Sequence, residues 1–172
     1  MIRKFLLTIF IITLPIRTFA LIEVDITRGN LDPLPLAVSP LSIDDFSKKN
    51  FKKILNKENI GSEISIIVEN NLRTSGLFNP LNKDAFLQAP DIANLKPRFE
   101  DWNLIKAQAL ITGKVSYVNE KLRVEFRLWD VLAAKEMMAL AFTTVPKNWR
   151  RVGHIITDKV YERLTGEKGY FD

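Results

Sequence analysis

The sequence lacks cysteine altogether and has a single histidine, His154, among its 172 residues. Without cysteine the protein can form no disulfide, iron–sulfur cluster or thiolate zinc site, and it has no cysteine nucleophile or lipid-modified N-terminal cysteine. One histidine also excludes a multi-histidine metal site within one chain. The rest of the composition, with 47% hydrophobic and 26% charged residues, is that of an ordinary globular protein. We therefore expect neither a metal nor a cofactor.

Sequence motifs of catalysis are missing as well. Gly113-Lys114 matches the last two residues of a phosphate-binding loop, but Gln108 stands in place of its first glycine and Val115 in place of its Ser/Thr. No Gly-x-Ser-x-Gly motif is present. His154 has one evident partner, Asp158, a single helical turn away, and this spacing is more typical of a helix-surface pair than of a catalytic triad. We therefore expect a protein that is not an enzyme.

Residues 1–20 have the pattern of a secretory signal peptide. Arg3-Lys4 precede an apolar run of ten residues from Phe5 to Leu14, and small residues at Thr18 and Ala20 define a cleavage site after Ala20. A run of this length is about half of the ~20 residues that cross a bilayer. The segment carries three basic residues and no acidic one, so its removal lowers the formal charge from +5 to +2. We expect an exported mature protein without membrane insertion.

The mature chain begins with a short segment of strict alternation, followed by a loop rich in glycine and proline. Gly29, Pro33 and Pro35 form a predicted hinge, because proline fixes an extended backbone and removes an amide donor. We interpret residues 21–33 as a mobile N-terminal strand and hinge. The strand either joins the edge of the protein's own sheet or adds to the sheet of a partner, and alternation alone does not decide between these. Its apolar face consists of Ile22, Val24 and Ile26, and its polar face of Glu23, Asp25 and Thr27.

Residues 34–172 are predicted to form one α+β domain. Helices are expected at 45–55, 60–74, 99–106 and 149–165, and strands at 36–38, 110–118, 122–131 and 137–145. Gly76 and Gly166 are placed to end two of the helices, and residues 82–97 are expected to be a loop with local turns. A meander of strands with helices at either end predicts a mixed sheet of about five strands with helices packed on one face.

Several segments, in this order, resemble the amino-terminal domain of the TolB family, the periplasmic components of Tol-Pal systems. They are Ile60-Gly61, the run V-E-N-N-L-R-T-S-G-L-F-N-P-L from 68 to 81, W-R-R-V-G-H from 149 to 154 and L-T-G-E-K-G-Y-F from 164 to 171. The likeness extends from about Ile22 to Asp172. It implies a fold similar to the anticodon-binding domains of tRNA ligases, which agrees with the mixed sheet predicted from the strand and helix pattern.

The resemblance also implies a function and a binding site. In the TolB family the extreme N-terminus of the mature chain is a mobile strand that binds the inner-membrane protein TolA, and here it corresponds to Ile22, Glu23, Val24, Asp25, Ile26 and Thr27. The expected role is that of a periplasmic scaffold that supports outer-membrane integrity and envelope constriction at cell division. Family members bind the lipoprotein Pal through a following β-propeller, and this chain ends at Asp172, so no residue present is assigned to Pal.

Five lysines in the helix predicted at 45–55 and just after it prompt an alternative function. They could form the phosphate-binding face of a nucleic-acid-binding module of the anticodon-binding type, or simply a solvated helix face. Export of the protein argues against nucleic acid as a partner. The lysines are Lys48, Lys49, Lys52, Lys53 and Lys57.

Overall fold

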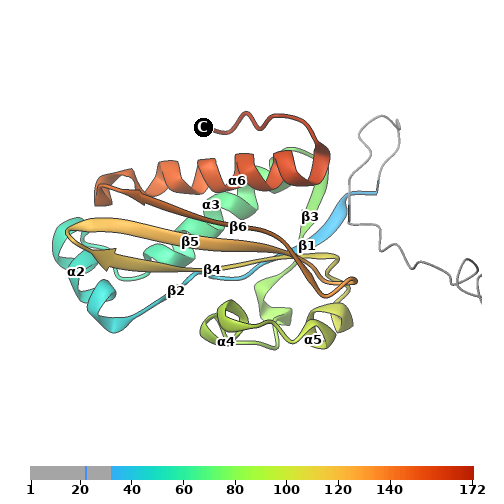
Figure 1. The fold of residues 1–172 in the computed structure, drawn as a ribbon, viewed down its shortest axis with the longest axis horizontal. Coiled ribbons are helices and arrows are strands. Elements are labelled where there is room, and N and C mark those ends of the chain that lie inside the picture. The colour runs from blue at the N-terminus through green and yellow to red at the C-terminus, as the bar shows by residue number, and fades with distance from the viewer. Residues whose placement is uncertain (1–21, 23–31) are drawn as a thin grey trace, which may run out of the picture.

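The computed structural model describes Ile22 and residues 32–172, and shows one sheet with helices on both of its faces (Figure 1). The strands are β1 (Leu34–Val38), β2 (Ser42–Ile43), β3 (Phe78–Pro80), β4 (Ala109–Val118), β5 (Lys121–Asp130) and β6 (Lys135–Thr144). The α-helices are α2 (Asp45–Leu55), α3 (Ile60–Thr74), α4 (Pro90–Leu95), α5 (Phe99–Leu104) and α6 (Trp149–Thr165). Two 3-10 turns, η1 (Lys83–Ala85) and η2 (Pro146–Asn148), complete the described elements.

The sheet is mixed, as the sequence predicted. Its strand order is β3-β1-β4-β5-β6, with β2 pairing to β4. β1 runs parallel to β3 and β4, whereas β4, β5 and β6 form an antiparallel meander. Asn119 and Glu120 form the tight turn between β4 and β5, and both have positive φ angles. This arrangement leaves β6 at one edge of the sheet, and β3 and the short β2 at the other.

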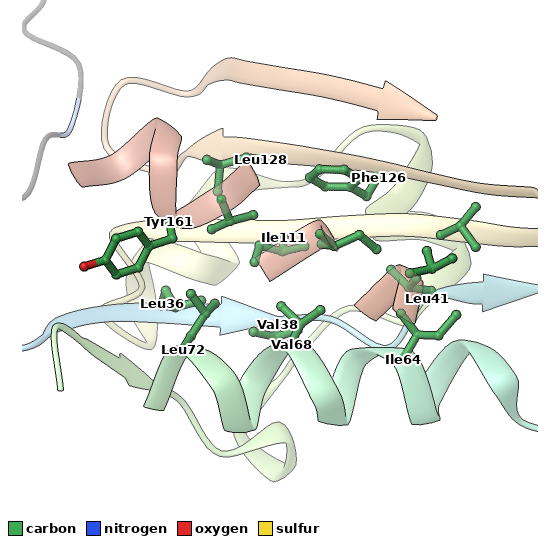
Figure 2. Close-up of a cluster of buried hydrophobic side chains, with 14 of the residues drawn as sticks. Leu36, Val38, Leu41, Ile64, Val68, Leu72, Ile111, Phe126, Leu128 and Tyr161 are labelled. Atoms are coloured by element: carbon green, nitrogen blue, oxygen red, sulfur yellow. The ribbon is translucent and has the colours of Figure 1, made fainter. Parts of the chain in front are cut away.

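The main core lies between the sheet and the two long helices, α3 and α6 (Figure 2). Every second residue of β5 points into it, namely Leu122, Val124, Phe126 and Leu128, each 1% exposed or less. From α3 the residues at spacings of three and four, Ile64, Val68 and Leu72, meet them from the helix side. The alternation of period two and the stripe of period 3.6 thus bury the same core from opposite sides.

Two short helices, α4 and α5, cover one end of the opposite face (Figure 1). Trp102 of α5 is 1% exposed and belongs to a second apolar cluster with Ala37 of β1 and Leu110 of β4. The sheet therefore carries helices on a second face as well as on the predicted one. The prediction of a loop at 82–97 is wrong for α4, because Pro90 starts a short helix there and Ala93 is buried in the second cluster.

The helix ends follow the chemistry of their capping residues. Asp44 caps α2 by accepting a hydrogen bond from the Ser47 amide at 2.8 Å. Gly76 and Gly166 follow α3 and α6 with φ angles of 74° and 76°, as predicted. Pro35, predicted in the hinge, instead lies inside β1, where its carbonyl accepts from the Gln108 amide at 2.9 Å. A proline fits at this position because the hydrogen bond to Gln108, just before β4, uses the proline carbonyl and needs no amide donor.

Within the part of the chain that the structure describes, no helix combines the length and apolar character that crossing a bilayer requires.

Candidate functional site

The predicted N-terminal strand is described at one residue, Ile22. Its backbone amide donates a hydrogen bond to Oδ2 of Asp130 at 3.2 Å, and its half-buried side chain packs against the main core. Glu23, Val24, Asp25, Ile26, Thr27 and Gly29 lie outside the described residues. Pro33 is exposed and directly precedes β1. Ile22 therefore contacts the end of β5, far from it in sequence.

Asp130 is the last residue of β5 and is 1% exposed. Its Oδ1 accepts the amide of Ala133 at 2.8 Å, which closes the turn into β6, and its Oδ2 faces Ile22. None of the ion pairs among the described residues involves Asp130, and its carboxylate accepts two backbone N–H groups there. A buried carboxylate is costly unless it is hydrogen-bonded. The position of Ile22 is thus coupled to a buried charge.

Sequence reasoning missed Asp130, although the signal was present. The inward face of β5 consists of apolar residues from Leu122 to Leu128, and Asp130 occupies the next inward position. A carboxylate at a position that alternation assigns to the core requires a polar partner. The sequence could have indicated that such a partner exists, but the identity of Ile22 as that partner depends on the tertiary fold.

The lysine helix is partly neutralised by neighbouring carboxylates. Lys48 pairs with Asp45 at 3.3 Å, Lys57 pairs with Glu63 at 2.6 Å, and Lys52 pairs with Glu58. Lys57 Nζ also lies 5.1 Å from the ring centre of Trp149, and Arg150 covers the same ring. Three of the five lysines therefore have acidic partners, which favours a solvated helix face over a phosphate-binding surface.

His154 has a different partner from the one predicted. Its Nδ1 lies 2.9 Å from Nδ2 of Asn71, which also donates to Oγ1 of Thr157 at 3.2 Å. Since an amide nitrogen can only donate, Nδ1 is the acceptor and the ring serves to join α3 to α6. Asp158 instead accepts the amides of residues 171 and 172. The prediction of a His154–Asp158 pair is wrong because it considered one helix and not the helix packed beside it.

The C-terminal residues run back along α6 (Figure 1). Arg151 donates through Nε and Nη2 to the carboxylate of Asp172, with a shortest distance of 2.9 Å. This hydrogen bond holds the pKa of the Asp172 carboxyl below its usual value. Gly169 lies against Asp158, where a Cβ would be 2.3 Å from Oδ1. These contacts hold the C-terminal residues against α6.

Among Ile22 and residues 32–172, no cluster of three or more metal-ligating side chains occurs.

Comparison with known proteins gives a consistent result. Residues 22–137 match the family model of the TolB amino-terminal domain. The chain is 81% identical over its 172 residues to the Tol-Pal system protein TolB of Pelagibacter ubique (strain HTCC1062), and it spans 38% of that protein's length. Its fold is similar to the crystal structure of TolB from Acinetobacter baumannii, with a TM-score of 0.63 and 20% identity over 86% of this chain and 32% of that chain. At that identity the structural likeness shows the fold alone.

Proposed function

Because the chain belongs to the TolB amino-terminal domain family, we propose that it is a periplasmic scaffold component of a Tol-Pal system that binds TolA through residues 22–27. Residues 1–20 direct export and are then removed. The scaffold supports outer-membrane integrity and envelope constriction at cell division. The 81% identity to a Tol-Pal system protein over the whole chain supports this role.

The observation that carries the TolA site is the contact of Ile22 with Asp130. Ile22, the one residue of this segment that the structure describes, makes one hydrogen bond of 3.2 Å and packs a half-buried side chain against the core. The contacts of Ile22 can be exchanged for the edge of another sheet, where main-chain hydrogen bonds give affinity and alternate side chains give register. The alternating residues 22–27 have the pattern that such an exchange requires.

Docking and partner binding then compete for the same segment. A partner that binds only the released strand shifts the population toward release, and its apparent affinity falls by the fraction of molecules in which the strand is docked. Asp130 contributes to this fraction, because its carboxylate accepts the Ile22 amide. The apparent affinity for TolA would therefore depend on whether the strand is docked on the domain or released.

Two neighbouring substitutions test which face of the strand 22–27 contacts TolA. Val24→Lys places a charge on the apolar face of the strand, and Asp25→Lys places the same charge on the polar face. By calorimetry with the soluble domain of TolA, the mature protein carrying Val24→Lys should bind at least about tenfold more weakly than that carrying Asp25→Lys, because burying a charge is costly. Equal losses for both variants would contradict strand addition with this register.

The same pair of variants tests the cellular role. Val24→Lys should make cells that depend on this protein leak periplasmic contents and become sensitive to detergent, whereas Asp25→Lys should have a smaller effect. Both proteins must be present at the parental level in the periplasmic fraction. A leak of equal size with both variants would argue against the proposed contact. Nucleic acid is not favoured as a partner, because three lysines of the basic helix are paired with carboxylates.

A further inference from the structure

β6 is an edge strand whose outer side is not paired with any described strand. From Met138 to Thr144 it contains no charged residue and no proline. Ala139, Ala141 and Thr143 are exposed along it, and Leu140 is 37% exposed. Natural edges are usually protected by charges, prolines or bulges, because an open edge pairs with other strands. This stretch lacks these protections.

The protective features that β6 does have are confined to its beginning. The ladder with β5 shifts register between Leu128 and Trp129, which leaves Met137 as a bulge. Nε of Arg163, on α6, donates to the carbonyl of Met137 at 3.3 Å. Among the described strands, the unpaired edge therefore starts at Met138 and is about seven residues long, which is a usual strand length.

α6 runs beside β6 (Figure 1), and two hollows between these elements form a groove along the same edge. One hollow of about 370 Å³ lies between Met138 and the last turns of α6, with Arg163 in its wall. A second of about 290 Å³ lies between Phe142 and the first turns of α6, with Val152 and Ile155 in its wall. Alternate side chains of an added strand would enter these hollows, because residues i and i+2 lie on one face of a strand.

The charged residues of the groove indicate which kind of segment would bind at this edge. Lys159 and Arg151 line the groove, and each pairs with a carboxylate, Glu162 and Asp172 respectively. Arg163 is different, because none of the ion pairs among the described residues involves it. A second copy of the chain would bring a second Arg163, with the same charge, to this edge. An acidic extended segment would instead place carboxylates near Arg163.

We propose that the outer edge of β6 is a docking site for an acidic, extended segment of another protein. The segment adds as a strand to residues 138–144, with alternate side chains in the groove against α6 and a carboxylate near Arg163. This site is separate from residues 22–27, which donate a strand rather than accept one. The protein would then have one donor strand and one acceptor edge at different places on a single sheet.

A synthetic probe tests the edge in the mature protein. The probe is an acetylated peptide of about ten residues in which Val alternates with Glu, and its control has Lys in place of Glu. The Val–Glu peptide should slow amide exchange at residues 138–144 of β6 and bind at least about tenfold more tightly than the Val–Lys peptide. Arg163→Gln should remove most of this preference.

Two leucines provide matched variants. Leu140→Lys puts a charge on the free edge, and Leu132→Lys puts the same charge on the turn before β6, where Leu132 is 64% exposed. Affinity for the Val–Glu peptide should fall at least about tenfold with Leu140→Lys and stay within about twofold with Leu132→Lys. Deletion of residues 21–32 should not change it, which separates this result from the test of TolA binding. Protection outside β6, equal effects of both leucine variants, equal binding of both peptides, or a dimer formed through β6 would overturn the proposal.

Discussion

Replacement of Asp130 should loosen the N-terminal segment while leaving the domain folded. The Asp130 carboxylate accepts two backbone amides, Ala133 at 2.8 Å and Ile22 at 3.2 Å, and it is 1% exposed. Asp130→Asn has nearly the same shape. Its amide oxygen can keep the Ala133 hydrogen bond, but its NH₂ group then faces the Ile22 N–H, donor against donor. Asp130→Ala removes both acceptors.

The magnitudes follow from the two contacts. A buried donor left without an acceptor costs about 1–3 kcal/mol, so Asp130→Ala should lower the free energy of unfolding by about that amount. Asp130→Asn should lower it by less, because Ala133 keeps its acceptor. Loss of a hydrogen bond to a charged group, about 1.5–3 kcal/mol, should raise the ratio of released to docked strand about 10- to 150-fold in either variant.

Urea unfolding gives the stability of each variant, and hydrogen exchange at the Ile22 amide gives the released fraction. Apparent affinity for TolA should rise in Asp130→Asn until the strand is fully released, and no further. The reasoning would be refuted if Asp130→Asn, still folded, left the Ile22 exchange rate at the parental value. Weaker TolA binding by this folded variant would equally contradict competition between docking and partner binding.

Three further predictions concern the stability of the folded domain. Gly61→Ala should lower the free energy of unfolding in urea by about 1–3 kcal/mol, because its Cβ would be 2.1 Å from the Leu41 carbonyl oxygen. The neighbouring Ser62→Ala should change it by less than about 0.5 kcal/mol. Equal effects of the two variants would contradict the importance of this close contact. Phe126→Ala should cost about 3–5 kcal/mol, since Phe126 is 1% exposed and stacks on Phe142 at 6.0 Å, and a loss below about 1 kcal/mol would contradict its place in the core. Burial raises the pKa of Glu69, but hydrogen bonds from Arg73 and Lys83 outweigh it and hold the pKa below the usual value. The Glu69 carboxylate therefore stabilises the folded state above the pKa that Glu69 has in the unfolded chain, and this contribution is lost as pH falls through the lower pKa of the folded state. Glu69→Gln should remove this pH dependence, so the free energy of unfolding should fall less steeply on the acid side. An unchanged curve of stability against pH would refute this.

Most of the fold could be predicted from the sequence, because its long elements have clear periods. β5 alternates without error, and α3 and α6 carry stripes that end at glycines with positive φ. α4 could not be found in this way, because six residues are too few to show a helical period. The sequence places Pro35 in the hinge because proline fixes an extended backbone and removes an amide donor. The local pattern does not show that its carbonyl accepts the amide of Gln108, just before β4.

The candidate site was only partly predictable, for a related reason. The alternation of residues 22–27 indicates a strand and gives its two faces, but not the sheet it joins. Asp130 and Ile22 are separated by 108 positions, and their contact depends on how the tertiary fold brings the end of β5 to Ile22. The partner of His154 was likewise set by the packing of α3 on α6 rather than by the spacing within α6.

The most direct test of the account is calorimetry of TolA binding with two forms of the mature protein, intact and lacking residues 21–32. The intact protein should bind saturably, and the shortened protein should show no binding while unfolding in urea at nearly the same midpoint. Unchanged affinity in the shortened, folded protein would contradict the claim that the N-terminal strand binds TolA.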